Sequence, residues 1–236
     1  MILYEDAQLV VCCKPRGVLS AADSSGQESM ASLLAPRAVF PVHRLDRDVP
    51  GVMVFAKTKE AASDMSRQVQ MKEADKFYYA VTDGVPVEKT GSLEDYLLRD
   101  GRTNTSKVVK EGTAGAKKAR LSYEVIAEDG THAILKIQLD TGRHHQIRVQ
   151  MAHHGTPLYG DMKYGVPVGT DKLDKKENAD QGTMKAAENR NMPGIRTAGN
   201  MGSGRESIAL CASSLTFFHP VTKKEMTFEI EPVGGA

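Results

Sequence analysis

The chain has 236 residues, 40% of them hydrophobic, and its 31 Lys and Arg residues nearly balance its 30 Asp and Glu residues, for a net charge of +1. This length and composition allow one large domain with a hydrophobic core. The small net charge argues against a protein that holds nucleic acid by bulk electrostatics alone, because a strongly basic domain is expected in that case. Any anion binding must therefore come from local arrangements of charge.

The N-terminal residues and the cysteines indicate the cellular compartment. The first six residues, MILYED, place acids where a secretory signal carries basic residues, and no apolar run reaches membrane-spanning length. Cys12 and Cys13 are neighbours and Cys211 stands alone, so neither a disulfide framework nor a Cys-x-x-Cys metal knuckle is present. We expect a cytoplasmic protein with reduced thiols and no membrane contact.

Apolar runs in the first half of the chain predict strands. Residues 9–13 form a short apolar run that a Lys-Pro-Arg-Gly turn closes at residues 14–17. Residues 51–56 (GVMVFA) are typical of a buried strand, and residues 77–81 return to a strand pattern. Between the last two, a helix is predicted over residues 59–72.

This predicted helix is amphipathic. Ala62, Met65 and Val69 recur at helical spacing, and Thr58 is a favourable N-cap directly before the segment. We therefore expect one face of the helix to pack on the protein core.

Two hairpins are predicted. Apolar and polar residues alternate over 121–127 and again over 133–139, on either side of the Asp129-Gly130 turn. Residues 214–218 and 225–230 flank a polar turn and predict a final hairpin.

A second helix is predicted over residues 145–154. It follows the Thr141-Gly142 break, carries Ile147 and Met151 four residues apart on one face, and meets Gly155, a residue well suited to end a helix.

Residues 166–207 differ from the rest of the chain. They are rich in Gly, Asn, Lys, Asp and Met and lack a sustained apolar period, so we expect a mobile insertion or lid. Elsewhere strands dominate. We therefore predict that residues 1–236 form one domain of the α+β class, a mixed, largely antiparallel β-sheet with flanking helices and loops.

Basic residues crowd one polar stretch in the middle of the chain. They are Arg102, Lys107, Lys110, Lys117, Lys118 and Arg120. From charge alone a solvated loop is the favoured interpretation, and contact with phosphates is the alternative.

A group of ionisable residues, His43-Arg44-Leu45-Asp46-Arg47-Asp48, lies directly before the predicted strand at 51–56. A surface loop with salt bridges is the usual role of such a cluster. The functional alternative is a carboxylate nucleophile beside cations, because an opposite charge within about 4–6 Å keeps an Asp ionised. An ionised carboxylate can attack a sugar or a polarised ring to form a covalent intermediate.

A second candidate segment runs from Asp140 to Arg148 (DTGRHHQIR), where a strand end, a glycine turn and a helix start converge. Helix N-termini and arginines attract anions, so phosphate binding is one interpretation. A capped helix with exposed basic residues is the other, and these residues alone leave both open.

Histidines suggest a zinc site as a further hypothesis. The five that do so are His43, His144, His145, His153 and His154. None belongs to a His-Glu-x-x-His motif, and adjacent histidines point in different directions on a helix. We therefore predict no metal site, and expect these side chains to be donors in a binding site or satisfied structural groups.

Taken together, these segments resemble the RluA-type RNA pseudouridine synthases. The resemblance covers nearly the whole chain except residues 166–207 and much of 86–118, and the short strings occur in the family's order. The strings are His43-Arg44-Leu45-Asp46 with Gly51 and Ala56-Lys57, KFYYAV at 76–81, TGRHHQIR at 141–148, and the shorter YED at 4–6, KPRG at 14–17, GD at 160–161, YG at 164–165 and HPVT at 219–222.

The chain departs from the family pattern at a few positions. The Thr-Ser pair that usually precedes the glycine of the catalytic segment is Val49-Pro50 here, the family's Thr-His-Gln is His144-His145-Gln146, and a following His is Gln150. These changes concern loop conformation and substrate choice more than the chemistry. Because so few residues precede Tyr4, we do not expect the small RNA-binding module that many relatives carry in front.

The resemblance implies a pseudouridine synthase fold and the isomerisation of uridine to pseudouridine in structured ribosomal or transfer RNA, without a metal or organic cofactor. Asp46 is the implied nucleophile, attacking either the anomeric carbon or carbon six of the ring. Tyr78 matches the tyrosine that stacks on the target base and is suited to proton removal from carbon five. Arg148 matches the arginine that pairs with the carboxylate and keeps it charged.

The resemblance also implies residues that contact the substrate. A uridine in an RNA stem must leave the stack to reach a pocket, and Arg44 resembles the family residue that fills the vacated space, because its planar guanidinium can stack on bases. The other candidates are His43, Arg143, His145 and Gln146, and the last three also suit a role in holding the backbone or the loop. We expect the enzyme to be a monomer.

Two alternatives belong to other functional classes. A catalytically silent RNA-binding protein on the same fold would lack Asp46, Tyr78 or Arg148, and all three are present. A metal hydrolase built on the histidines would bind zinc stoichiometrically and lose activity with a chelator, so a metal analysis of the purified protein would separate it.

Overall fold

The computed structural model describes residues 1–165 and 207–231. Its strands are β1 (Ile2–Glu5), β2 (Leu9–Lys14), β3 (Phe40–Pro41), β4 (Gly51–Ala56), β5 (Asp75–Asp83), β6 (Thr90–Asp100), β7 (Thr105–Val109), β8 (Lys117–Glu128), β9 (His132–Leu139), β10 (Leu210–Phe218) and β11 (Glu225–Glu229). Its helices are α1 (Met30–Leu33), α2 (Lys59–Met71) and α3 (Gln146–His153). The predicted insertion at 166–207 lies outside the described residues, apart from Ser207.

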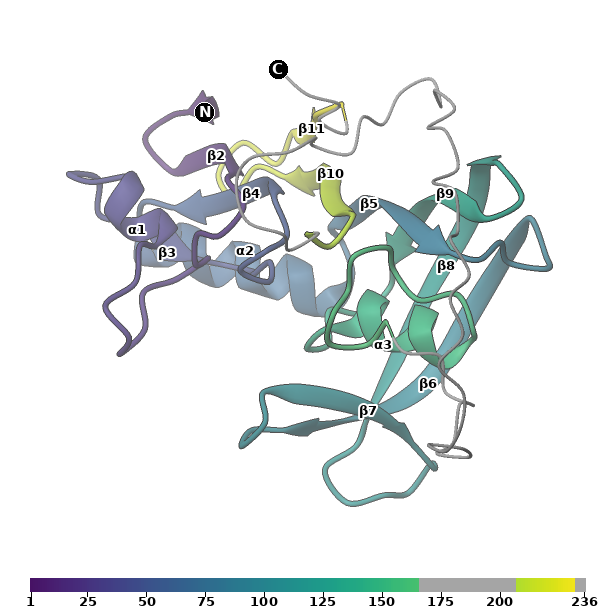
Figure 1. Ribbon diagram of the computed structural model, residues 1–236. Coiled ribbons are helices and arrows are strands. Elements are labelled where there is room, and N and C mark those ends of the chain that lie inside the picture. Colours follow the sequence, from purple (N-terminus) through teal and green to yellow (C-terminus); the bar gives the residue numbers. More distant parts are fainter. Residues whose placement is uncertain (166–206, 232–236) are drawn as a thin grey trace, which may run out of the picture.

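One mixed sheet organises this part of the chain (Figure 1). Its order is β1-β2-β4-β10-β5-β9-β8-β6-β7, with β3 added beside β4 and β11 beside β10. Every pairing is antiparallel except that of β4 with β10. The predicted α+β fold with a largely antiparallel sheet is therefore confirmed.

The sheet has two parts, which join where β4 pairs with β10. These two strands pair at one position, Gly51 with Ala212, and beyond it β3 continues along β4 while β11 continues along β10. Gly51 has φ +137°, and a Cβ there would lie 2.2 Å from the carbonyl oxygen of Ala212. Glycine is therefore required at the point that joins the two parts of the sheet.

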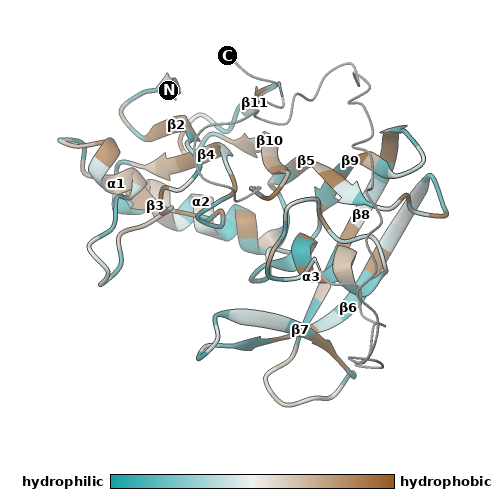
Figure 2. Ribbon diagram, in the orientation of Figure 1, coloured by the Kyte–Doolittle hydropathy of each residue, from teal (hydrophilic) through white to brown (hydrophobic). Residues whose placement is uncertain are grey.

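The hydrophobic core lies on both faces of the central strands. All six residues of β4 are buried, as the GVMVFA pattern predicts. Met53 and Phe55 belong to one core cluster, whereas Val52 and Val54 belong to a second cluster on the other face, together with Met65 of α2. Figure 2 shows the resulting concentration of hydrophobic residues on β4 and β10.

Helix α2 begins as predicted, because the Thr58 side chain accepts a hydrogen bond from Ala61 N at 3.1 Å. Its buried face differs by one position from the prediction: Gln68 is buried, and Val69 borders a cavity. The amide of Gln68 donates a hydrogen bond to Phe218 O at 2.7 Å and accepts one from Phe218 N at 2.9 Å. Both backbone polar groups of Phe218, the last residue of β10, therefore have a partner.

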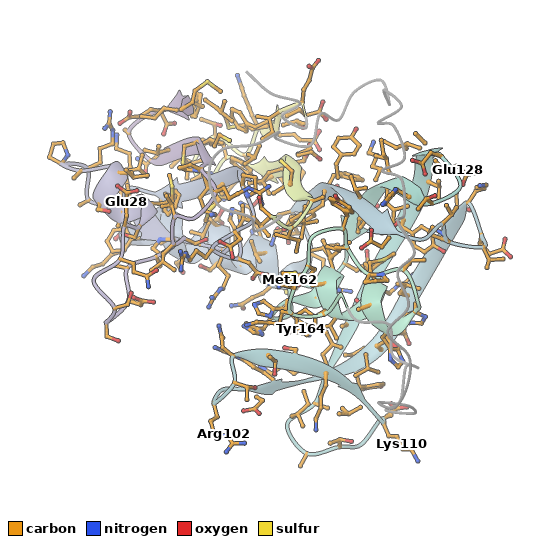
Figure 3. All side chains as sticks on the ribbon, in the orientation of Figure 1. Glu28, Arg102, Lys110, Glu128, Met162 and Tyr164 are labelled. Atoms are coloured by element: carbon orange, nitrogen blue, oxygen red, sulfur yellow. The ribbon has the colours of Figure 1, made fainter. Side chains whose placement is uncertain are left out.

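The predicted hairpins are confirmed as β8–β9 and β10–β11. The basic stretch is solvated, as its charge favoured, since all six of its Lys and Arg side chains are exposed, but it is only partly a loop. It forms the β6–β7 hairpin and the start of β8, from which Arg102 and Lys110 project (Figure 3). The sequence over β6 lacks the apolar alternation that predicts a strand, because Leu97 is the one fully buried residue of β6. None of the helices in the described parts of the chain has the length and apolarity to cross a membrane.

Candidate active site

Asp46 lies in the loop between β3 and β4, and hydrogen bonds hold the backbone on both sides of it. Leu45 N donates to Ser20 Oγ at 2.9 Å, and the same hydroxyl donates to Leu45 O at 2.7 Å. On the other side, Arg47 O accepts from the buried Lys14 Nζ at 2.8 Å. The Asp46 side chain, 21% exposed, is therefore presented from a well-held loop.

His43 attaches the start of this loop to the sheet. Its Nε2 accepts a hydrogen bond from Val54 N at 3.2 Å. Burial, together with the charge of Lys76, lowers the pKa of His43 to about 3, so the ring is neutral and remains an acceptor. The ring also borders the cavity beside Asp46.

Arg148 of α3 lies between two carboxylates. Its Nη1 is 3.5 Å from Asp46 Oδ2. Its Nε and Nη2 donate to the two oxygens of Asp161 at 2.8 and 2.7 Å. Asp161 is buried and also accepts from Lys163 N at 3.0 Å. The bidentate pair with Asp161 is the stronger of the two contacts of Arg148.

The charge state of Asp46 depends on opposing effects. Burial raises the pKa of the Asp46 carboxyl above its usual 3.8, the positive charges of Arg148 and Arg44 lower it, and the negative charge of Asp161 raises it again. The net direction is upward. Arg148 therefore favours the ionised carboxylate, as the resemblance implies, but burial outweighs this effect in the absence of substrate.

His145 borders Asp46 as a neutral ring. Burial and the charge of Arg148 lower the pKa of His145 to about 2. Tyr164 Oη accepts from Ser106 N at 2.8 Å and lies 2.8 Å from His145 Nδ1, so its hydroxyl hydrogen is available to that nitrogen. The Nε2–H of His145 then faces Asp46 Oδ2 at 3.7 Å, as a polar neighbour rather than an ion-pair partner.

His144 joins the β6–β7 hairpin to the site. Its ring stacks on His145 with 3.7 Å between centroids. Its Nε2 donates to Asn104 Oδ1 at 3.1 Å, and its Nδ1 lies 2.9 Å from Ser106 Oγ. Because burial lowers the pKa of His144 to about 4, Nδ1 accepts from that hydroxyl. The hairpin that the sequence did not predict is therefore bonded to the residues around Asp46.

Gln146 holds the turn before α3. Its Oε1 accepts from Thr141 Oγ1 at 2.7 Å and from Arg143 N at 3.0 Å, and its Nε2 donates to Arg120 O at 3.0 Å. Gln146 is buried with these contacts. Of the two roles considered for it, the geometry favours holding the loop.

Tyr78 faces Asp46 from β5. The opposing strand β10 has a bulge here, since Ala212 pairs with Tyr78 and Ser214 with Phe77. The Tyr78 hydroxyl has no hydrogen-bond partner among the described residues, and its ring borders the cavity. Burial, with the nearby charge of Asp46, raises the pKa of Tyr78, so the side chain is a phenol at neutral pH.

Two cavities meet at Asp46, with volumes of about 500 and 830 Å³. Arg44, Asp46, His145 and Arg148 border both. Tyr78 borders only the first of them, which we name the Tyr78 cavity. Six Lys or Arg residues but only two Asp residues border the Tyr78 cavity. The site is therefore electropositive although the whole chain carries a net charge of only +1.

All eight site residues predicted from the sequence border the Tyr78 cavity. They are His43, Arg44, Asp46, Tyr78, Arg143, His145, Gln146 and Arg148. Sequence reasoning did not assign a role to Asp161 or Tyr164, which hold Arg148 and His145. The available signal was their position in the Gly160-Asp161 and Tyr164-Gly165 strings.

The five histidines lie in three places. His43 is on the Asp46 loop, His144 and His145 precede α3, and His153 and His154 are at its far end. His154 Nε2 lies 3.1 Å from Asp95. Across residues 1–165 and 207–231, no group of three or more His, Cys, Asp or Glu side chains is arranged to hold a metal ion.

Known proteins resemble this chain in sequence. The family model described as RNA pseudouridylate synthase matches residues 8–153. "Uncharacterized RNA pseudouridine synthase MG209 homolog" of Mycoplasma pneumoniae is 30% identical over 236 residues, covering 98% of this chain and 66% of that protein. "Ribosomal large subunit pseudouridine synthase D" of Pseudomonas aeruginosa is 35% identical over 174 residues, covering 70% of this chain and 53% of that protein. The chain thus spans about half to two thirds of the length of these curated relatives.

Solved structures share the fold. "Human RNA Pseudouridylate Synthase Domain Containing 4" matches with a TM-score of 0.67 and 24% identity, covering 97% of this chain and 87% of that chain. This likeness concerns the fold. The family model and the sequence relatives lead to one conclusion: the chain belongs to the RNA pseudouridylate synthase family and, within it, to the RluA type.

Proposed function

We propose that this protein isomerises uridine to pseudouridine in structured RNA, with Asp46 as the nucleophile. The observation that carries the proposal is the meeting of Asp46, Tyr78 and Arg148 at one cavity of about 500 Å³. Membership of the family supports the type of reaction. The excess of cations around the cavity supports a polyanionic substrate, because phosphates bind where Lys and Arg gather.

The chemistry requires a bond at each end of the base to change. Asp46 either displaces N1 from carbon one of the ribose, or adds to carbon six of the ring before the bond from the sugar to N1 breaks. The base turns, carbon five bonds to carbon one of the sugar, and the bond to Asp46 breaks, either in that step or by elimination from carbon six. The proton on carbon five then leaves and N1 takes up a proton, so atoms balance without an oxidant, reductant or cofactor. Asp46 must be ionised to attack, and the Arg148 guanidinium favours that form.

Tyr78 supports this reaction first as a stacking surface. Its ring borders the cavity from β5, and aromatic rings hold single bases by stacking. As a base for the carbon-five proton it must first pass on its own proton, because its pKa is raised. The free hydroxyl faces the cavity, where a substrate group or water can receive that proton.

Arg44 is the proposed replacement for the extruded uridine in the RNA stack. It is exposed, borders both cavities, and has no hydrogen-bond or ion-pair partner among the described residues. A free guanidinium beside the nucleophile is suited to stack on bases and to meet phosphate. Arg143, whose Nε donates to Lys118 O at 2.9 Å, holds the cavity wall and presents its remaining nitrogens to the RNA.

Ribosomal RNA is the proposed target class. The Pseudomonas aeruginosa relative bears the name "Ribosomal large subunit pseudouridine synthase D", which favours ribosomal over transfer RNA. We propose that the enzyme acts in the cytoplasm as a monomer and without a metal or organic cofactor.

Release of tritium from RNA labelled at carbon five of uridine tests the reaction, because that hydrogen leaves as pseudouridine forms. We expect the purified protein to release tritium from large-subunit ribosomal RNA in the presence of a chelator. Mapping pseudouridines in total RNA with and without the gene identifies the target. No release from ribosomal or transfer RNA, or release that a chelator abolishes, would overturn the proposal.

A further inference from the structure

Lys76 places a cation in the wall of the Tyr78 cavity. It lies two residues before Tyr78 on β5, and residues two apart on a strand face the same side, about 6.6 Å apart along it. Burial lowers the pKa of Lys76 to about 8. The ammonium group is therefore held partly out of water, beside the proposed position of the target base.

No acid in the described parts of the chain pairs with Lys76. Its ammonium also has no hydrogen-bond partner there. The acids next to it in the chain and in the cavity wall are engaged elsewhere. Asp75 accepts from Gln138 Nε2 at 3.2 Å, Asp140 pairs with Arg120 at 2.9 Å, and Asp46 faces Arg148 at 3.5 Å. A desolvated charge without a counter-charge destabilises the folded protein. This arrangement is understandable if the counter-charge arrives with the substrate.

Two further cations border the same cavity and are absent from the larger one. The side chain of Lys72, the residue after α2, has no partner among the described residues. Arg143 uses Nε for Lys118 O and leaves its two terminal nitrogens without a partner there. Lys72, Lys76 and Arg143 thus form a wall of unpaired cations away from the larger cavity.

We propose that Lys72, Lys76 and Arg143 form a phosphate site, which holds an RNA backbone phosphate next to the target uridine, with Lys76 as its partly buried ligand. The inference rests on the proposed function, because it takes RNA as the substrate. A phosphate fits better than a carbonyl oxygen of the base, since a neutral oxygen calls for one donor and three cations are present. Charged pairs to phosphate are strong when partly buried.

Lys76→Met tests the site, because methionine keeps the length and apolar body of the side chain and removes the charge. Lys136→Met is the matched control: Lys136 is an exposed lysine on the neighbouring strand β9, placed over the Phe77 ring and not at the cavity. We expect Lys76→Met to weaken RNA binding roughly tenfold, measured by anisotropy, and to raise KM similarly with kcat near wild type. Thermal stability should stay equal or rise, because an unpaired, partly buried charge is lost.

The second arm replaces single phosphates around the target uridine by neutral methylphosphonates. One replacement should weaken binding to the wild type and to Lys136→Met about as much as Lys76→Met does, and should have no further effect on Lys76→Met. If every replacement weakens Lys76→Met as much as wild type, Lys76 does not bind phosphate.

A loss in kcat alone would assign Lys76 to the reacting base, and a fall in Tm with parallel loss of binding would assign it a structural role. Failure of the proposed function differs from these results: the wild type would show no turnover, while the binding arms would still report on the site.

Discussion

Asp161 holds the guanidinium of Arg148 through two hydrogen bonds of 2.7 and 2.8 Å, whereas Arg148 meets Asp46 through one contact of 3.5 Å. The side chain of Asp161 is 1% exposed and that of Asp46 is 21% exposed. The arginine is therefore oriented independently of Asp46, the proposed nucleophile. Its position does not need to change when, in the proposed reaction, Asp46 gives up its charge to form a covalent bond.

Asp46→Asn should abolish pseudouridine formation and leave the fold and RNA binding intact. The amide has a similar shape but is a far poorer nucleophile than a carboxylate. The loop should keep its position, because Ser20 and Lys14 hold it through the backbone of Leu45 and Arg47. Tritium release within tenfold of the wild-type rate would contradict the role of Asp46.

Tyr78→Phe should bind RNA almost as wild type does and react much more slowly. The change keeps the ring for stacking and removes a hydroxyl that has no partner among the described residues, so stability should hardly change. Single-turnover rates and anisotropy measure the two effects separately. Equal losses of binding and rate would instead give Tyr78 a packing role.

Asp161→Asn should lower kcat and move the acid limb of the pH profile of kcat/KM to lower pH. The charge of Asp161 raises the pKa of Asp46, so its removal lowers that pKa, and Asp46 stays ionised at more acid pH. The rate falls, by up to about 10²-fold, because Arg148 loses one of its two bonds to residue 161; the other bond keeps its charge beside Asp46, but the guanidinium is held less precisely.

The control for this pH shift is Asp95→Asn. Asp95 is a well-shielded carboxylate that accepts from Gln150 Nε2 at 2.7 Å and lies at neither cavity. Its loss should affect stability without moving the acid limb. An unchanged limb in Asp161→Asn, or the same shift in both variants, would show that Asp161 does not act on Asp46.

The residues proposed to react could be predicted from the sequence, and the residues that hold them were less accessible. Asp46, Tyr78 and Arg148 stand in short strings whose order indicates the family. The hold of Asp161 on Arg148 depends on how the turn after α3 folds back, which no local period encodes. The β6–β7 hairpin was missed for a related reason: few of its side chains are buried, so its strands lack the apolar alternation that reveals a strand.

Lys14→Met should destabilise the protein by about 2–3 kcal/mol, since one buried and two partly buried carbonyls would lose their donor. Lys14 Nζ donates to the backbone oxygens of Pro15, Val18 and Arg47 at 3.0, 2.7 and 2.8 Å. Urea unfolding measures the change, and Lys110→Met, at an exposed lysine, serves as the control. Equal midpoints for the two variants would show that these hydrogen bonds contribute nothing to stability.

The single pairing of Gly51 with Ala212 has a consequence for how the enzyme can change its target. Ala212 pairs with Gly51 on one side and with Tyr78 on the other, and Asp46 lies five residues before Gly51. The separation between the proposed nucleophile and the proposed stacking ring thus depends on three paired backbone positions, Gly51, Ala212 and Tyr78, in addition to the loop before Gly51. Substitutions in the walls of the two cavities can therefore change which RNA is accepted, while the separation between Asp46 and Tyr78 stays constant.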